Sequence, residues 1–133
     1  MILVDTSVLI DYLKGMKNKS TGSFERVIDQ GIPFGIHHLT YMEVLQGAKS
    51  ETDYKTLKKY LDTQHFYDLK KGKMSFADAA KMYRTLRSKG VTIKSSVDCF
   101  IVQVAIENGL FLLHNDVDFT RIARHFPLKI WDI

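Results

Sequence analysis

Short apolar runs alternate with longer amphipathic stretches along the whole chain. The runs are too short for helices and stop at polar or turn residues, so they predict strands. The expected strands cover about residues 2–4, 33–36, 66–67, 111–113 and 128–130. The stretches between them carry apolar residues at helical spacing and predict helices at about residues 6–13, 23–30, 39–48, 52–61, 75–89, 97–108 and 117–125.

Polar residues and glycines mark the expected ends of these helices. Thr6-Ser7 and Ser95-Ser96 stand before apolar helical stretches, which is the position of an N-cap. Thr40, with Glu43 three residues later, has the spacing of a capping box. Gly109 stands where the helix at 97–108 should end.

Strands that alternate with helices favour a parallel sheet with helices on both faces. The chain has no internal repeat, low-complexity segment or linker, and its 133 residues suit one domain with a substantial core. We therefore expect a single α/β domain over residues 1–133, with three α/β/α layers around a short-stranded, mostly parallel sheet.

Four acidic residues stand where apolar runs end or helices begin. Asp5 follows the first expected strand and Asp116 the fourth, and the carboxyl ends of parallel strands meet at one rim of a sheet. Glu43 and Asp98 fall in the first turns of two helices that open toward this rim. Taken alone, each acid could also cap a helix or interact with the positive end of a helix dipole. Together they would repel one another without a cation, and carboxylate oxygens favour Mg²⁺ or Mn²⁺.

The charge balance agrees with a polyanionic partner. The net charge is +4 and the sequence pI is about 9.1. Lysines and arginines gather at residues 14–19, 55–59, 70–73, 84–94 and 121–124. A basic surface around an acidic metal site suits a polyanion held through its phosphates. Because +4 is a modest excess, each cluster also fits an ordinary solvated helix face.

The cysteine content and the apolar stretches bear on the compartment. The single Cys99 cannot form an internal disulfide, which favours a reducing compartment. Residues 1–10 lack the basic start of a signal peptide, and no apolar stretch reaches the roughly 18 residues of a membrane span. We expect a cytoplasmic protein that does not enter a membrane.

Other chemistries find less support in the sequence. His37-His38 and His114 follow two strands and invite a zinc interpretation, but no H-x-x-x-H or Cys/His spacing accompanies them, so their role stays open. Cys99 fits a small buried hydrophobe better than a nucleophile. No G-x-G-x-x-G, P-loop or G-x-S-x-G motif is present.

Three segments of the chain resemble the motifs of PIN-domain ribonucleases, and within that superfamily those of VapC-type toxins from prokaryotic toxin–antitoxin pairs. They are residues 2–10 (ILVDTSVLI), 95–98 (SSVD) and 112–119 (LLHNDVDF). Glu43 lies on the helix after the second strand, where the family has its second acid. Any one motif is weak, but the four acids in this order are fairly specific.

The resemblance implies a compact PIN-like fold, a homodimer, a site for Mg²⁺ or Mn²⁺, and cleavage of RNA. The family's catalytic acids fall on Asp5, Glu43, Asp98 and Asp116. Three of them, Asp5, Asp98 and Asp116, would hold the metal, while Glu43 would orient a water or serve a second metal position.

The supporting residues and partners also follow from the resemblance. Thr6, Asn115 and Asp118 would hold the metal-binding carboxylates from behind. The chain would act as an endoribonuclease toxin, restrained by a cognate antitoxin. We expect that antitoxin to place an Arg or Lys near the acids and an apolar segment in a groove between helices.

Two alternatives use the same residues. The first is a non-catalytic PIN-like module that binds RNA or protein, which would be signalled by loss of a principal acid, and none is lost. The second is a metal-dependent phosphatase with an Asp nucleophile after the first strand. Such enzymes usually carry a second Asp two residues later, and here that residue is Ser7.

Overall fold

The sheet predicted from the apolar runs is present, and all of its strand pairs are parallel. The computed structural model describes residues 1–132. The strands are β1 (Ile2–Val4), β2 (Phe34–Ile36), β3 (His65–Phe66), β4 (Phe111–Leu113) and β5 (Lys129–Ile130), in the order β3-β2-β1-β4-β5. The expected mostly parallel α/β architecture is thereby confirmed.

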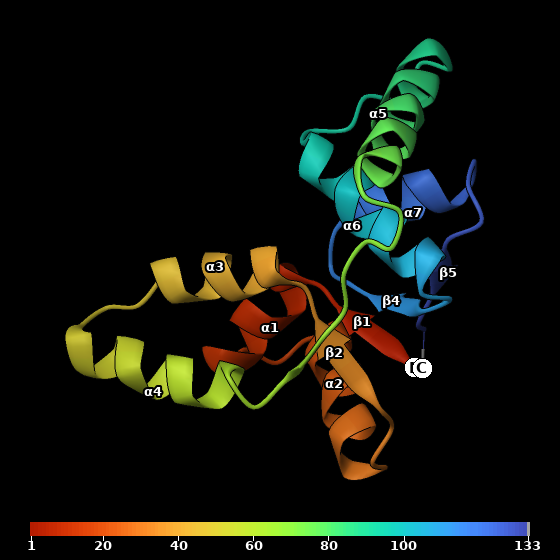
Figure 1. Ribbon diagram of the computed structural model, residues 1–133. Helices are drawn as coiled ribbons and strands as arrows, with labels where there is room; N and C mark the ends of the chain where they lie inside the picture. The colour runs from red at the N-terminus through yellow and green to blue at the C-terminus, as the bar shows by residue number, and fades with distance from the viewer. Residues whose placement is uncertain (133) are drawn as a thin grey trace.

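Seven helices lie along the described chain, and they cover both faces of the sheet (Figure 1). They are α1 (Thr6–Leu13), α2 (Lys19–Asp29), α3 (His38–Gln46), α4 (Glu51–Leu61), α5 (Lys73–Ser88), α6 (Ser96–Glu107) and α7 (Val117–Ala123). Helices α1 to α4 pack on one face and α5 to α7 on the other, which gives the three layers.

The central strand β1 feeds both cores because its side chains alternate between the faces. Ile2 and Val4 join the core under α1 to α4, whereas Leu3 joins the core under α5 to α7. Leu3 pairs with Leu112 of β4, which points to the same side. Burial on both faces explains why these strands are apolar throughout rather than alternating with polar residues.

The position of β1 also fixes where a ligand can bind. The chain moves from β1 to β2 on one side and returns to β4 on the other, so β1 is the point where the strand order reverses. In open parallel sheets the crevice beyond the carboxyl ends of the strands at such a point is the usual binding site. Asp5 stands directly after β1, at this place.

The start of α2 differs most from the sequence prediction, and the start of α3 differs in its cap. Helix α2 begins at Lys19 rather than near residue 23, because Asn18 caps it and exchanges capping-box hydrogen bonds with Thr21. Helix α3 begins at His38, and its N-cap is His37, whose Nδ1 accepts from Leu39 N at 3.0 Å. The connection between α1 and α2 is therefore shorter than the expected helices at 6–13 and 23–30 implied.

The predicted capping box of α3 is wrong because the N-cap is His37 and not Thr40. Thr40 lies buried inside the helix, and Glu43 lies in its second turn rather than its first. At α1 the cap is Asp5, which accepts from Ser7 N, and not the Thr6-Ser7 pair. The predicted end of α6 is confirmed, since Gly109 follows it with φ +62, a conformation that suits glycine.

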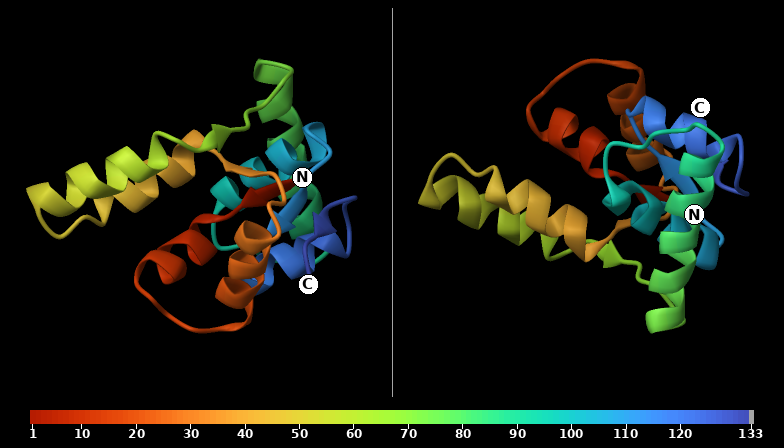
Figure 2. Two further views of the ribbon diagram at one scale, coloured as in Figure 1. Left: turned by 90° about the horizontal axis from the view of Figure 1, so that it is seen from below. Right: turned by 90° about the horizontal axis from the view of Figure 1, so that it is seen from above.

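Helices α3 and α4 form a hairpin that projects away from the rest of the molecule (Figure 2). Within the described residues, no helix is long and apolar enough to cross a membrane.

Candidate metal centre

The predicted acids converge at the carboxyl edge of the sheet. The pKa of Asp98 is raised to about 7, chiefly by burial and in addition by the nearby charges of Asp116, Asp5, Asp118 and Glu43. Acids from three other parts of the chain are therefore close enough to repel Asp98. The four predicted catalytic acids lie together, and Asp118 lies with them.

Asp5 is held rigidly at the end of β1. Its Oδ2 accepts hydrogen bonds from Ser7 N at 3.1 Å and from Ser7 Oγ at 2.6 Å. Burial raises the pKa of Asp5, and these hydrogen bonds oppose that shift because they stabilise the charged form. The carboxylate therefore caps α1 and faces the acidic cluster at the same time, so its structural and chemical roles are not alternatives.

Thr6 fixes Glu43, as a supporting residue should. The Thr6 Oγ1 hydroxyl donates to Glu43 Oε1 at 2.9 Å and lies 3.2 Å from Thr40 Oγ1. This contact joins the first turn of α1 to the second turn of α3. The residue that resembled a local cap in the sequence is thus engaged by a side chain 37 positions away.

Asp98 and Asp116 face one another across the site. Asp98 lies in the first turn of α6, where the positive end of the helix favours a carboxylate. Asp116 caps α7, with its Oδ1 accepting from Asp118 N at 2.9 Å. Carboxylate oxygens of Asp98, Asp116 and Asp118 all lie within 4.8 Å of one another, close enough to share one cation.

Asp118 differs from its neighbours because it is almost fully buried and already has partners. Its side chain is 1% exposed. Oδ2 accepts from Lys94 N at 3.2 Å, and Oδ1 accepts from Arg121 at 3.2 Å. Both oxygens are engaged, so Asp118 is suited to holding α7 against the loop before α6. Its role behind metal-binding carboxylates stays a prediction.

Asn115 supports the site through its backbone N–H. Its N–H donates to Ser7 Oγ at 3.1 Å, and that hydroxyl in turn donates to Asp5 Oδ2. The following peptide N–H, of Asp116, donates to His114 Nδ1 at 3.1 Å. The loop between β4 and α7 is thereby tied to the start of α1, which fixes the spacing between Asp5 and Asp116.

Several residues of this network were not predicted to support the acids. Ser7, His114, Lys94 and Arg121 all hold an acidic residue or its loop in place. Ser7 carried a signal, since it lies two positions after Asp5, and His114 had been considered only as a possible zinc ligand. The contact between Arg121 and Asp118 also follows an (i, i+3) helix spacing.

The donor set fits a hard divalent cation. The side chains that converge are carboxylates, which suit Mg²⁺ and Mn²⁺, and Mg²⁺ retains several waters so that a few carboxylates suffice. Cys99 follows Asp98, but burial raises the pKa of its thiol to about 11, so it is a poor ligand and nucleophile. The site therefore resembles neither a zinc nor a thiol site.

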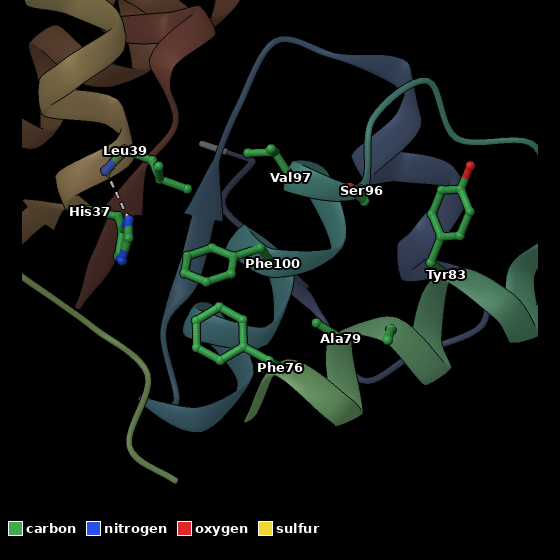
Figure 3. A pocket seen from close by; sticks show the side chains of 9 residues that line it. His37, Leu39, Phe76, Ala79, Tyr83, Ser96, Val97 and Phe100 are labelled. Carbon is green, nitrogen blue, oxygen red and sulfur yellow. Dashed lines mark hydrogen bonds between the residues drawn. The ribbon is translucent and has the colours of Figure 1, made fainter. Parts of the chain in front are cut away.

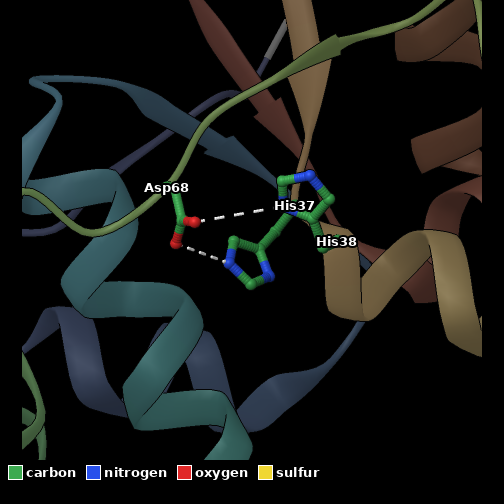
Figure 4. A group of neighbouring side chains, drawn as sticks. All are labelled: His37, His38 and Asp68. Atoms are coloured by element: carbon green, nitrogen blue, oxygen red, sulfur yellow. Dashed lines mark hydrogen bonds and ion pairs between the residues drawn. The ribbon is translucent and has the colours of Figure 1, made fainter.

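A second group of possible ligands, His37, His38 and Asp68, lies at the end of β2 (Figure 4). His37 Nε2 is 3.0 Å from Asp68 Oδ1, and His38 Nδ1 is 4.0 Å from Asp68 Oδ2. Because Nδ1 of His37 accepts from the backbone of Leu39, the ring proton lies on Nε2 and is donated to Asp68. Metal binding at Nε2 would require removing that proton, so these contacts favour a helix cap.

The comparisons with known proteins agree with this geometry. The family model described as PIN domain matches residues 2–125. The chain is 30% identical over 125 residues to VapC ribonuclease Mb1587 of Mycobacterium bovis, covering 93% of this chain and 92% of that protein. The same figures hold for Ribonuclease VapC11 of Mycobacterium tuberculosis.

Solved structures with the same fold include two complexes. VapBC2 from Rickettsia felis, bound to a DNA fragment from its promoter, aligns with a TM-score of 0.74 and 19% identity over 98% of both chains. VapBC-1 from nontypeable Haemophilus influenzae aligns with a TM-score of 0.69 and 26% identity, over 99% of this chain and 98% of that one. The sequence match over almost the whole chain, the parallel sheet and the acidic cluster lead to one assignment: the chain belongs to the PIN-domain family, among the VapC ribonucleases.

Proposed function

We propose that residues 1–133 form a single domain that acts as a Mg²⁺-dependent endoribonuclease, the toxin of a toxin–antitoxin pair. The observation that carries this proposal is the convergence of carboxylates at the carboxyl edge of the sheet, where oxygens of Asp98, Asp116 and Asp118 lie within 4.8 Å of one another. Carboxylates that lie this close repel one another, and a bound divalent cation removes that repulsion by neutralising their charge. The similarity to VapC ribonuclease Mb1587 and Ribonuclease VapC11 supports RNA as the substrate. RNA cleavage in the cell would place the protein in the cytoplasm.

In this proposal Asp5, Asp98 and Asp116 hold the cation. A bound Mg²⁺ or Mn²⁺ would supply Lewis-acid stabilisation of phosphate oxygens and a lowered pKa for water. Glu43, held by the Thr6 hydroxyl, would orient the attacking water and accept its proton. Asp98 must lose its own proton for the cation to bind, which a pKa of about 7 allows at neutral pH.

A direct experiment separates the three possible activities. The purified protein is incubated with RNA and, separately, with a small phosphate ester, each with Mg²⁺ and with EDTA. A nuclease cleaves RNA only with Mg²⁺ and leaves the ester intact. Hydrolysis of the ester alone would indicate the phosphatase, and no reaction with either substrate would indicate the non-catalytic module.

This chain has a groove in which a segment of the antitoxin could bind. A pocket of about 550 Å³ lies between α1 and the α3–α4 hairpin. Its walls include Ile10, Val44 and Leu57, while Lys14 and Lys49 stand at its edge. Glu43 immediately precedes Val44 along α3. An apolar antitoxin segment in this groove, with acidic residues facing the lysines, could therefore extend an Arg toward the carboxylates.

A second apolar surface supports the predicted homodimer. A pocket of about 590 Å³ lies between the start of α3 and helices α5 and α6 (Figure 3). Phe76 and Phe100 lie side by side in it, with ring centroids 5.4 Å apart. The Phe76 side chain is 57% exposed, and Val97 nearby is 40% exposed. Exposed apolar groups gathered in one place are typical of a protein interface, and we propose a second copy of the chain as its partner.

A further inference from the structure

A pocket of about 490 Å³ opens beside the metal centre on the side of β5. The first turns of α2, the loop between β4 and α7, and the residues after β5 form its walls. The end of the described chain lies beside α2 and α7 in both views of Figure 2. At the solvent-exposed mouth of the pocket, Lys19 Nζ forms an ion pair of 2.9 Å with Asp132. The volume is within the range of about 300–1,000 Å³ that is usual for small-ligand sites.

The pocket and the metal centre share one loop. His114 and Asn115 line the pocket, and Asp116, the next residue, belongs to the acidic cluster. The Asn115 N–H donates to Ser7 Oγ, which donates to Asp5. A ligand group in the pocket would therefore lie next to whatever is held at the carboxylates.

The pocket offers polar groups and one aromatic ring. His114 Nδ1 accepts from Asp116 N, so the neutral ring presents its Nε2–H as a donor. Thr120 contributes an exposed side chain and Lys19 a cation at the mouth. Trp131 contributes an indole ring that also packs edge-to-face on Phe111, with centroids 5.6 Å apart.

The indole N–H of Trp131 stands out among the described residues. It is the one buried side-chain polar atom between residues 1 and 132 that has no hydrogen-bond partner. A buried donor without an acceptor is destabilising. The ring is thus held by its packing on Phe111 and not by a hydrogen bond.

We propose that this pocket binds one unpaired nucleotide of the RNA substrate, next to the phosphate held at the metal centre. The base stacks against Trp131, and its phosphate takes the place of the Asp132 carboxylate at Lys19. Proteins read single-stranded RNA in this way, with splayed bases stacked on aromatic rings and hydrogen-bonded at their edges. The inference rests on the proposed ribonuclease function, which it extends from the scissile phosphate to a neighbouring base.

The chain provides its own probe, because Trp131 is its only tryptophan. We would follow Trp131 fluorescence in EDTA, where cleavage is prevented, while adding AMP, GMP, CMP or UMP. We expect saturable quenching by at least one nucleotide and none by ribose 5-phosphate, which has the phosphate without the base. Equal quenching by ribose 5-phosphate, or none by any nucleotide, would overturn the proposal.

Variants of the pocket give a second readout. Thr120→Phe should fill the pocket without touching the acids and weaken nucleotide binding about 5- to 150-fold, as expected for loss of one stacked base. Thr56→Phe on α4, exposed and outside the pocket, is the matched control and should bind as the wild type does. In cleavage assays Thr120→Phe should also alter the preferred cutting sites, whereas the control should not.

The outcomes separate this inference from the proposed function. Quenching by nucleotides in a protein that never cleaves RNA would leave the pocket assigned and contradict the nuclease. Metal-dependent cleavage with unchanged sites in Thr120→Phe would leave the nuclease in place and contradict the pocket. Quenching by an antitoxin peptide, with none by nucleotides, would also overturn the assignment and make this surface part of the inhibitory interface.

Discussion

Replacing Asp98 with Asn should stabilise the metal-free protein, although it removes a residue of the proposed catalytic site. Asp98 is half-buried beside Asp116, Asp5, Asp118 and Glu43, and its pKa rises from 3.8 to about 7. In the unfolded chain the carboxyl ionises near the lower value, so at pH 8 folding places a charge where it is disfavoured. Asparagine keeps the shape of the side chain and removes this charge.

The magnitude follows from the size of the shift. A change from 3.8 to about 7 is about 3 pKa units, and each unit corresponds to about 1.4 kcal/mol. The upper limit is therefore ~4 kcal/mol at a pH above both values. Counter-ions and local relaxation reduce it, so we expect about 2 kcal/mol. For a chain of this length that corresponds to a rise in Tm of about 7 °C.

The assay is thermal unfolding in EDTA between pH 8 and pH 5. Because the folded pKa is raised, the wild type should gain stability as the pH falls through 7 toward 3.8, and Asp98→Asn should lack this gain. Asp29→Asn, at the exposed end of α2, is the charge-matched control and should follow the wild type. The reasoning is refuted if Asp98→Asn is no more stable than the wild type at pH 8 and keeps the same pH dependence.

Three further predictions concern the supporting residue and the two partner surfaces. Thr6→Val removes the donor to Glu43 and should slow RNA cleavage roughly tenfold. The control Thr56→Val, on exposed α4, should cleave at the wild-type rate, and equal rates in both variants would show that Thr6 does not support the site. Leu57→Asp in the groove beside α1 should weaken antitoxin binding, and alanine at the antitoxin's inserted Arg or Lys should restore cleavage; full inhibition by every such antitoxin variant would contradict site blocking. Phe76→Ser should shift the protein toward the 15.3 kDa monomer in light scattering, and a wild type that is only monomeric at micromolar concentration would contradict the dimer.

The sheet and the meeting of the acids at one edge were predictable because they depend on patterns that are local in the sequence. Strands buried on both faces are apolar throughout, so Ile2 to Val4 and Phe111 to Leu113 stand out, and the acids that follow them must meet at one edge. The start of α2 was missed because Asn18 and Thr21 form a capping box without the usual acidic residue.

The hydrogen bonds that support the site could not be read from the sequence. Thr40 and Glu43 have the spacing of a local cap, but Glu43 is bound by Thr6 of another helix. His37 caps α3 with a ring nitrogen, which no pattern of Ser, Thr, Asp or Asn would indicate. Contacts between distant elements, such as Asp118 with Lys94, depend on the packing of the whole fold.

The central claim is that the converging carboxylates hold the cation that cleaves RNA. The most direct measurement is RNA cleavage with Mg²⁺ by Asp5→Asn, Asp98→Asn and Asp116→Asn, beside Asp29→Asn and with circular dichroism to confirm folding. The account predicts loss of cleavage and weaker Mg²⁺ binding by calorimetry in the first three proteins, with all four folded and the control fully active. Cleavage at the wild-type rate in a folded Asp5→Asn or Asp98→Asn protein would contradict it.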